Sequence, residues 1–184
     1  MTPPVRTQRP RTALRNARQL EASCSPGTHS RRPRWAARPR PSQMLDCVAM
    51  PQRFYRAMTP EGDGLPAVGR TARCLGVRPS DVVVGRDGWV DPGTGGMSVA
   101  PGSPWSVPNH RRPTGMGRGS TGHNGDRVYA IEEAPLTAER LAVRPDPERP
   151  ALHAFVEPAV KMLLGDYEAG VAATRHAWEI VWPR

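Results

Sequence analysis

Short apolar runs separated by turns cover most of the chain, and this pattern predicts β-strands more than helices. The runs lie at residues 53–58, 81–84, 97–100, 128–131, 141–143 and 152–156. Residues 101–126 contain four prolines and six glycines and therefore predict a long loop. A loop of that length in a compact domain is typical of a functional lid or of a mobile segment.

One amphipathic helix is expected near the C-terminus. Side chains that can face a core recur there at three- and four-residue spacing, at Leu164, Tyr167, Val171, Thr174, Trp178 and Val181. This spacing places them on one face of a helix over residues 164–181. Many strands followed by one helix favour an α+β fold with a mixed or antiparallel sheet.

The net charge of +9 is concentrated in the first part of the chain. Residues 1–49 hold ten arginines against two acids, whereas residues 50–184 hold sixteen basic residues against fifteen acids. The Arg/Pro/Ser-rich composition of residues 1–49 predicts a disordered tail, and translation starting at Met50 is an equally good explanation of it. A basic arm that binds nucleic acid is the functional alternative. The near-neutral domain at residues 50–184 itself argues against a nucleic-acid partner.

The cysteines, the histidines and the hydropathy mainly exclude kinds of site and segment. Three cysteines without CxxC spacing predict neither a disulfide framework nor a zinc site, and the histidines lack metal-ligand spacing. No apolar run is long enough for a membrane span, and no secretory signal is recognisable. We therefore expect a protein of the cytoplasm, either in the cell that makes it or in a cell to which it is delivered.

The stretch DVVVGRDGWVDPGTGGMSV, Asp81–Val99, has two glycine-bracketed turns followed by a serine. Glycine adopts positive φ and lets other groups approach the main chain closely. The stretch predicts either two ordinary hairpin turns or the floor of a ligand pocket. Arg86 and Asp87 have the composition of a turn, and we expect Arg86 to be a secondary contact to a phosphate group.

Several segments together resemble a known toxin family. The main one is Asp81–Gly88 with Pro92, Thr94–Gly96 and Ser98–Val99, and the others are Phe54–Ala57, Pro135–Asp146, His153–Met162 and Trp178. They are similar, in the same order, to the type six effector two family, which comprises type VI secretion effectors with an ADP-ribosyltransferase-like fold. The resemblance spans roughly residues 53–180. It implies an antibacterial toxin that uses NAD as a substrate, either transferring ADP-ribose to an unknown acceptor or hydrolysing NAD, and that is neutralised by a cognate immunity protein.

Cleavage of the nicotinamide–ribose bond requires a cation, a hydroxyl group, and a carboxylate that stabilises the oxocarbenium-like centre or orients the acceptor. We expect these from Arg56 on the first strand, Ser98 after the glycines, and His153 with Glu157 on a later strand. The predicted catalytic residues are thus Ser98, His153 and Glu157, and the predicted NAD-binding residues are Tyr55, Arg56, Arg86, Thr94, Gly95 and Gly96.

The sequence departs from the family pattern at two positions. Met97 stands where the family has a threonine, and Glu157 stands where it has an apolar residue. Glu157 is therefore inferred from spacing alone, and the adjacent pair Glu132–Glu133 is its rival. These departures leave open a catalytically silent binding module of the same fold.

Overall fold

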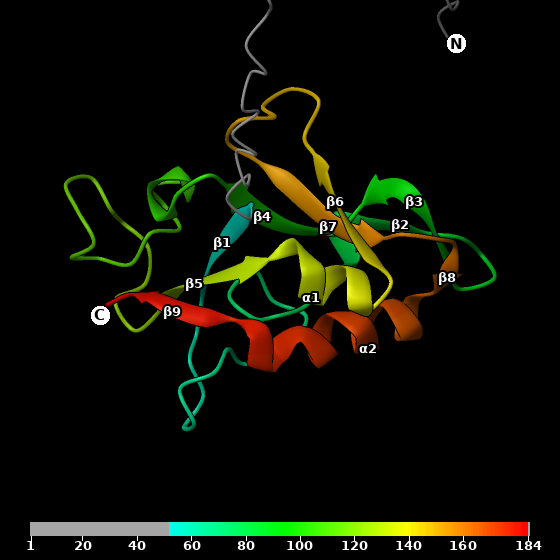
Figure 1. Cartoon of the computed structure of the whole chain (residues 1–184), viewed down its shortest axis with the longest axis horizontal. Coiled ribbons are helices and arrows are strands. Elements are labelled where there is room, and N and C mark those ends of the chain that lie inside the picture. Colours follow the sequence, from blue (N-terminus) through cyan, green and yellow to red (C-terminus); the bar gives the residue numbers. More distant parts are fainter. Residues whose placement is uncertain (1–51, 184) are drawn as a thin grey trace, which may run out of the picture. The chain divides into compact units, whose positions relative to one another are not determined.

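The computed structural model describes residues 52–183, so the predictions for residues 1–49 and for a start at Met50 lie outside the described residues. The described part is α+β, as the sequence predicts, with antiparallel strands in two sheets and one main helix (Figure 1). The strands are β1 (Arg53–Met58), β2 (Val82–Val84), β3 (Trp89–Gly95), β4 (Met97–Pro101), β5 (Arg127–Glu132), β6 (Leu141–Pro145), β7 (Ala154–Pro158), β8 (Met162–Leu163) and β9 (Glu179–Trp182). The helices are α1 (Glu133–Ala138) and α2 (Leu164–Ala173), with 3₁₀ turns η1 (Pro79–Asp81), η2 (Pro104–Ser106) and η3 (Thr174–Ala177).

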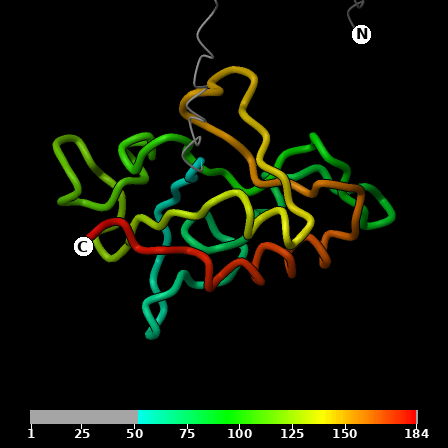
Figure 2. The backbone as a smooth tube through the Cα atoms, viewed as in Figure 1, coloured from blue at the N-terminus to red at the C-terminus, as the bar shows by residue number. Residues whose placement is uncertain are grey.

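The larger sheet has the strand order β6-β7-β4-β1-β5-β9, and the smaller one the order β2-β3-β8. Each face of the larger sheet has its own apolar cluster, because successive side chains of a strand point to opposite faces. Phe54, Met58 and Tyr129 lie on the face that α2 covers with Tyr167 and Val171. The opposite face is covered by the long loop after β4, which packs on it through Val107 and Met116. In the backbone tube of Figure 2, this loop and α2 lie on either side of β1 and β5.

The C-terminal segment corrects the predicted helix at residues 164–181. Helix α2 ends at Ala173, and after η3 the chain forms β9, which pairs with β5 at the edge of the sheet. Ile180 lies opposite Tyr129, and Trp182 lies opposite Val128. Strand pairing satisfies the backbone of this segment and suits its β-branched residues, and this outweighs the helical spacing of the apolar positions.

The first of the two predicted turns in the glycine-rich stretch, GRDG, is a hairpin turn. GRDG connects β2 to β3, with hydrogen bonds from Gly85 N to Trp89 O and from Gly88 N to Gly85 O. Gly88 has a φ of +80°, which glycine adopts without strain. Most of PGTGG belongs to β3 itself, a strand that its prolines and glycines conceal in the sequence.

The larger sheet divides between β1 and β4. These strands pair only at Phe54–Pro101 and Tyr55–Ala100, after which β4 pairs with β7 through Met97, Ser98 and Val99. Strand β1 continues alongside β5 over its whole length. A gap therefore opens beside Arg56, and this gap positions the candidate site.

Within residues 52–183, no helix has the length and apolar character needed to cross a membrane.

Candidate functional site

A cleft of about 750 Å³ lies over the gap between β1 and β4. Its wall combines β1, β4, the segment 72–81, the segment 105–112 that begins within η2, and the loop between β6 and β7. Among the predicted site residues, Tyr55, Arg56, Ser98 and His153 line it. The structure thus brings together four residues that are up to 98 positions apart in the chain.

Arg56 is the most deeply placed cation of the cleft, with only 8% of its surface exposed. Its Nη1 donates to Ser98 O at 2.5 Å, and its Nη2 donates to Ala72 O and Cys74 O at 3.2 Å each. Its Nε is buried without a hydrogen-bond partner. Burial and the nearby Arg111 lower the pKa of Arg56 to about 10, so it remains protonated at neutral pH.

The cleft has a marked excess of positive charge. The described residues that line it include five arginines, Arg56, Arg78, Arg111, Arg112 and Arg149, and one carboxylate, Asp81. Asp81 forms a two-point ion pair with Arg78 at 2.8 Å. Within residues 52–183 the other four arginines have no carboxylate partner. Burial also lowers the pKa of Arg111 from its usual value.

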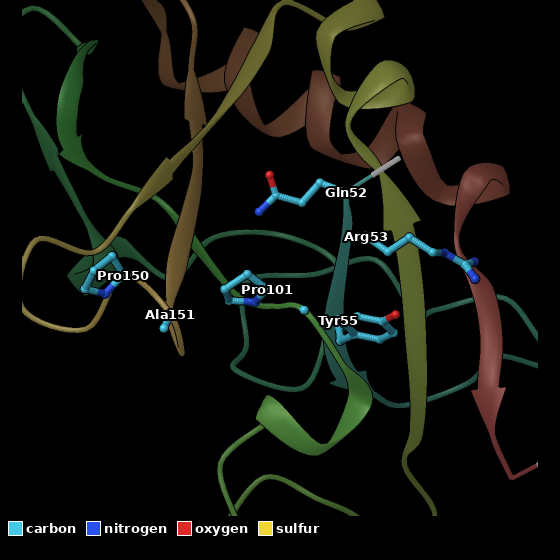
Figure 3. Close-up of a pocket in the computed structure, with 7 residues that line it drawn as sticks. Gln52, Arg53, Tyr55, Pro101, Pro150 and Ala151 are labelled. Carbon is cyan, nitrogen blue, oxygen red and sulfur yellow. The ribbon is translucent and has the colours of Figure 1, made fainter. Parts of the chain in front are cut away.

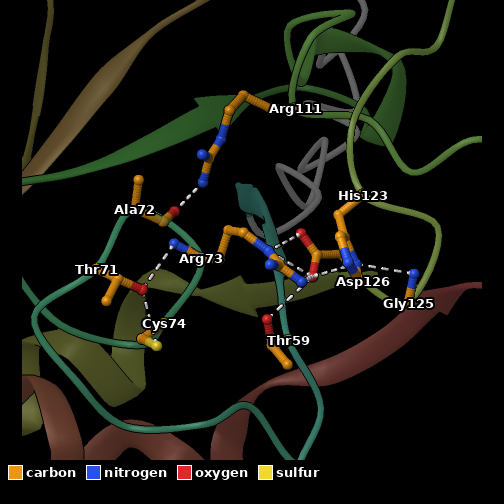
Figure 4. Close-up of polar contacts among 9 residues, drawn as sticks. All are labelled: Thr59, Thr71, Ala72, Arg73, Cys74, Arg111, His123, Gly125 and Asp126. Carbon is orange, nitrogen blue, oxygen red and sulfur yellow. Dashed lines mark hydrogen bonds and ion pairs between the residues drawn. The ribbon is translucent and has the colours of Figure 1, made fainter.

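The segment that carries Ala72 is anchored by a separate ion-pair network (Figure 4). Arg73 donates to both carboxylate oxygens of Asp126, at 2.6–3.0 Å, and Thr59 donates to the same carboxylate. Arg111 reaches across to Ala72 O, which Arg56 also contacts. The two cleft arginines therefore converge on one fixed carbonyl group.

Ser98 and Tyr55 lie on the cleft face of the sheet. Ser98 pairs with Phe155 and Tyr55 pairs with Ala100, so both side chains point to the face away from α2. Among residues 52–183, no hydrogen bond engages the hydroxyl of Ser98.

His153 lies at the end of the β6–β7 loop, immediately before β7. Its Nδ1 is 2.7 Å from Oδ2 of Asp146, and its ring meets the edge of Phe155 at a centroid distance of 4.6 Å. Asp146 also accepts a hydrogen bond from Glu148 N at 2.9 Å. The hydrogen bond from His153 is the main cause of a lowered pKa at Asp146. His153 and Asp146 thus form a hydrogen-bonded pair beside the cleft.

Gly95 and Gly96, which we predicted to bind NAD, are not among the residues that line the cleft. A Cβ at Gly95 would lie 2.2 Å from Asp81 O, and one at Gly96 would lie 2.2 Å from Val156 O. At both glycines, the group that approaches closely is the backbone of a neighbouring strand or turn. These glycines allow β3 to lie against β2 and β4 against β7, and they support the cleft only indirectly.

Arg86, Thr94 and Glu157 also lie outside the residues that line the cleft. Arg86 is exposed in the β2–β3 turn, and Thr94 donates to Asp91 O. Glu157 is 4% exposed and accepts from Arg144 at 3.0 Å and from Gly93 N at 3.1 Å. The Glu157 side chain shares a face of the sheet with Phe155, as the two-residue period predicts. Its carboxylate, however, is paired with Arg144, which also lies over the Phe155 ring.

The rival carboxylates are exposed at the junction of β5 and α1. Glu132 ends β5 and Glu133 begins α1. Neither lines the cleft.

Trp105 adds an aromatic surface to the wall of the cleft. It lies in η2, is 54% exposed, and has the Arg112 guanidinium 5.7 Å from its ring centroid. A half-exposed indole in a basic cleft is suited to stacking on a nucleobase.

A smaller pocket of about 350 Å³ adjoins the cleft at Tyr55 (Figure 3). Pro101 lines it from the end of β4, and Pro150 and Ala151 line it from the β6–β7 loop. The Arg53 side chain extends toward β9, where it forms an ion pair with Glu179 (Figure 3). The β6–β7 loop therefore lines both hollows, the pocket with Pro150 and Ala151 and the cleft with residues that include His153.

Sequence reasoning missed the residues that loops contribute to the cleft, above all Arg111 and Trp105, and it missed Asp146, which pairs with His153 beside the cleft. The adjacent arginines Arg111–Arg112 within a glycine- and proline-rich loop were the available signal for the first. In the described part of the chain, His, Cys, Asp and Glu side chains form no cluster of three that could hold a metal ion.

No protein-family model matches the chain, and no curated protein compared with it matches either.

Proposed function

We propose that the cleft binds NAD as a substrate and that the chain is an NAD-dependent, ADP-ribosyltransferase-like enzyme. It would transfer ADP-ribose to an acceptor or hydrolyse NAD. One observation carries the proposal: cleft arginines without carboxylate partners lie beside Ser98 and His153 in a single cleft. Its volume of about 750 Å³ is within the range of small-molecule sites, roughly 300–1,000 Å³.

The charge of the cleft favours a phosphorylated ligand. Removing a cation from water is costly unless an opposite charge compensates it. Arg56 is nearly fully buried and is hydrogen-bonded only to neutral carbonyls. A pyrophosphate would supply the missing negative charge, and the planar guanidinium groups of Arg56 and Arg111 are suited to its oxygens.

The other parts of NAD have matching partners in the same wall. The unengaged hydroxyl of Ser98 is suited to a ribose, and the Trp105 indole is suited to one of the bases. These assignments fit the ADP-ribosyltransferase-like fold that the sequence resembles. The division of the sheet beside a first-strand arginine, with a serine on the neighbouring strand, is in keeping with that fold.

The biological role rests on the sequence resemblance. It supports an antibacterial toxin that is a type VI secretion effector, acts in the cytoplasm of a target cell and is neutralised by an immunity protein. Expression of the full chain in a bacterium tests this role. Growth should stop while NAD falls or ADP-ribosylated products accumulate, and normal growth with unchanged NAD would contradict it.

The activity itself is tested by release of nicotinamide from NAD by the purified chain. Release should depend on Ser98 and His153, and Arg86→Ala should behave as the wild type because Arg86 is exposed outside the cleft. Absence of both nicotinamide release and saturable NAD binding would refute the proposal.

A nucleotide-binding module without turnover is the second candidate. Asp81 is the one carboxylate among the described residues that line the cleft, and it is held by Arg78. Saturable binding of NAD without release of nicotinamide would favour this candidate.

A further inference from the structure

The pairing of His153 with Asp146 fixes which ring nitrogen carries the proton. The pKa of Asp146 is lowered, chiefly by the hydrogen bond from His153, so Asp146 is ionised at neutral pH. An ionised carboxylate accepts hydrogen bonds and cannot donate one. The Nδ1 of His153, 2.7 Å from Oδ2, therefore carries the hydrogen, and in the neutral ring the Nε2 has a free lone pair.

The surroundings leave this lone pair available. His153 lines the cleft, and its side chain is 25% exposed. Within residues 52–183, no hydrogen bond involves its Nε2. Glu148 N holds the other oxygen of Asp146, so the carboxylate cannot rotate freely away from the imidazole.

We infer that His153 is the general base of the cleft and that Asp146 is the residue that positions it, for a reaction with a neutral hydroxyl acceptor such as water. This inference rests on the proposed function. The acceptor oxygen bonds to C1′ of the nicotinamide ribose as its proton passes to Nε2 of His153. The bond from C1′ to the nicotinamide nitrogen breaks, and its electron pair neutralises the pyridinium ring of the departing nicotinamide. With water as the acceptor, the products are ADP-ribose, nicotinamide and a proton.

The cleft supports this assignment because, among the described residues that line it, no carboxylate is free to act as the base. Glu157 is engaged by Arg144 outside the cleft, and Asp81 is engaged by Arg78. The excess of arginines in the cleft also disfavours a cationic acceptor, such as a guanidinium group, and favours a neutral one.

Asp146→Asn is the sharpest test because it keeps the shape of the side chain and reverses the direction of its hydrogen bond with His153. Glu148 N would still donate to the amide oxygen, which turns the amide NH₂ toward His153. The Nδ1 would then have to accept, so the ring proton would move to Nε2 and remove the lone pair. We expect kcat for nicotinamide release by the full-length chain to fall about a hundredfold, with little change in KM for NAD.

Two further variants separate a positioning role from a structural one. His153→Gln should lower kcat by about as much as Asp146→Asn, and the double variant should be no slower than either, because the two side chains act as one unit. His123→Gln is the matched control, since His123 lies 3.8 Å from Asp126 outside the cleft (Figure 4). It should leave kcat unchanged.

The outcomes distinguish failure of the inference from failure of the proposed function. A wild-type chain that releases no nicotinamide would overturn the proposed function, and this inference with it. An active wild type with unchanged kcat in folded Asp146→Asn would overturn the positioning role alone. Multiplicative losses in the double variant would show that the two side chains act independently, and this too would overturn it.

Discussion

Replacing Arg56 by alanine tests the central feature of the cleft, a buried cation without a carboxylate partner. The guanidinium has two functions that the experiment must separate. It donates to three carbonyl oxygens of the protein. Under the proposed function, it also binds the pyrophosphate of the ligand. We therefore expect a loss of affinity for pyrophosphate-containing ligands together with a smaller loss of stability.

The loss of affinity follows from the ligand contact. A hydrogen bond to a charged group contributes about 1.5–3 kcal/mol, which corresponds to roughly a ten- to hundredfold increase in Kd. The loss should be specific to ligands that carry the pyrophosphate. Binding of ADP-ribose should weaken by this factor, whereas binding of adenosine should change little.

The loss of stability follows from the carbonyl contacts. Ala72 O keeps its hydrogen bond from Arg111, whereas Ser98 O and Cys74 O each lose a charged donor. An unsatisfied buried acceptor costs about 1–3 kcal/mol, and removal of a desolvated cation offsets part of that cost. We expect the free energy of unfolding to fall by about 1–3 kcal/mol.

Titration calorimetry with ADP-ribose measures the affinity, and denaturant unfolding measures the stability. ADP-ribose is the suitable ligand because it has the pyrophosphate but no nicotinamide bond to cleave. Arg86→Ala removes an exposed arginine from the same domain and should change neither quantity. The reasoning is wrong if folded Arg56→Ala binds ADP-ribose as tightly as the wild type, or if Arg86→Ala weakens binding equally.

Further predictions concern the core, the strand contacts, acid stability and the N-terminal segment. Trp178→Ala should lower the free energy of unfolding by about 3–5 kcal/mol, because the ring is 2% exposed in the core, and an unchanged unfolding midpoint would contradict this. Gly96→Ala should lower the melting temperature because its Cβ would meet a carbonyl oxygen at 2.2 Å, whereas Gly165→Ala, with open space and a helical site, should leave it unchanged or higher. Asp146 has a lowered pKa in the folded state, so its stabilisation is present near neutral pH and is lost as the pH falls through that pKa. Melting curves for Asp146→Asn should therefore depend less on pH below about 5 than those of the wild type. Deleting residues 1–49 should leave melting and nicotinamide release unchanged, and a large loss of either would mean that the segment packs or recruits a partner.

The sequence predicted the strands better than the end of the helix. Short apolar runs located β1, β4 and β5 to within about one residue, because these strands are buried in the apolar clusters on the two faces of the larger sheet. Helical spacing continued past Ala173 to Val181, but there the chain pairs with β5. Pairing at the edge of a sheet depends on a partner 50 residues away, so no local pattern reports it.

In the candidate site, the residues on strands were easier to predict from the sequence than the residues on loops. Arg56, Ser98 and Tyr55 were predicted because the resemblance supplied the strands to compare. Tyr55 and Ser98 share the face away from α2, whereas Arg56 points to the opposite face and lines the cleft at the gap between β1 and β4. Arg111 and Asp146 were missed because loops position them, Arg111 in the wall of the cleft and Asp146 against His153 beside it. Glu157 was placed on the right face, but the arginine that engages it could not be seen from its spacing.

The glycines before Ser98 explain why a ligand site is hard to recognise from glycine alone. The absence of a Cβ indicates that another group lies close to the backbone, but it does not identify that group. At Gly95 and Gly96 the close neighbours are the carbonyl oxygens of Asp81 and Val156, so the space is filled by protein. That contact holds β4 against β7 and directs Ser98 O to the guanidinium of Arg56. The glycines therefore serve the cleft by setting the positions of the strands around it, and the residues that line it include the arginines, Ser98 and His153.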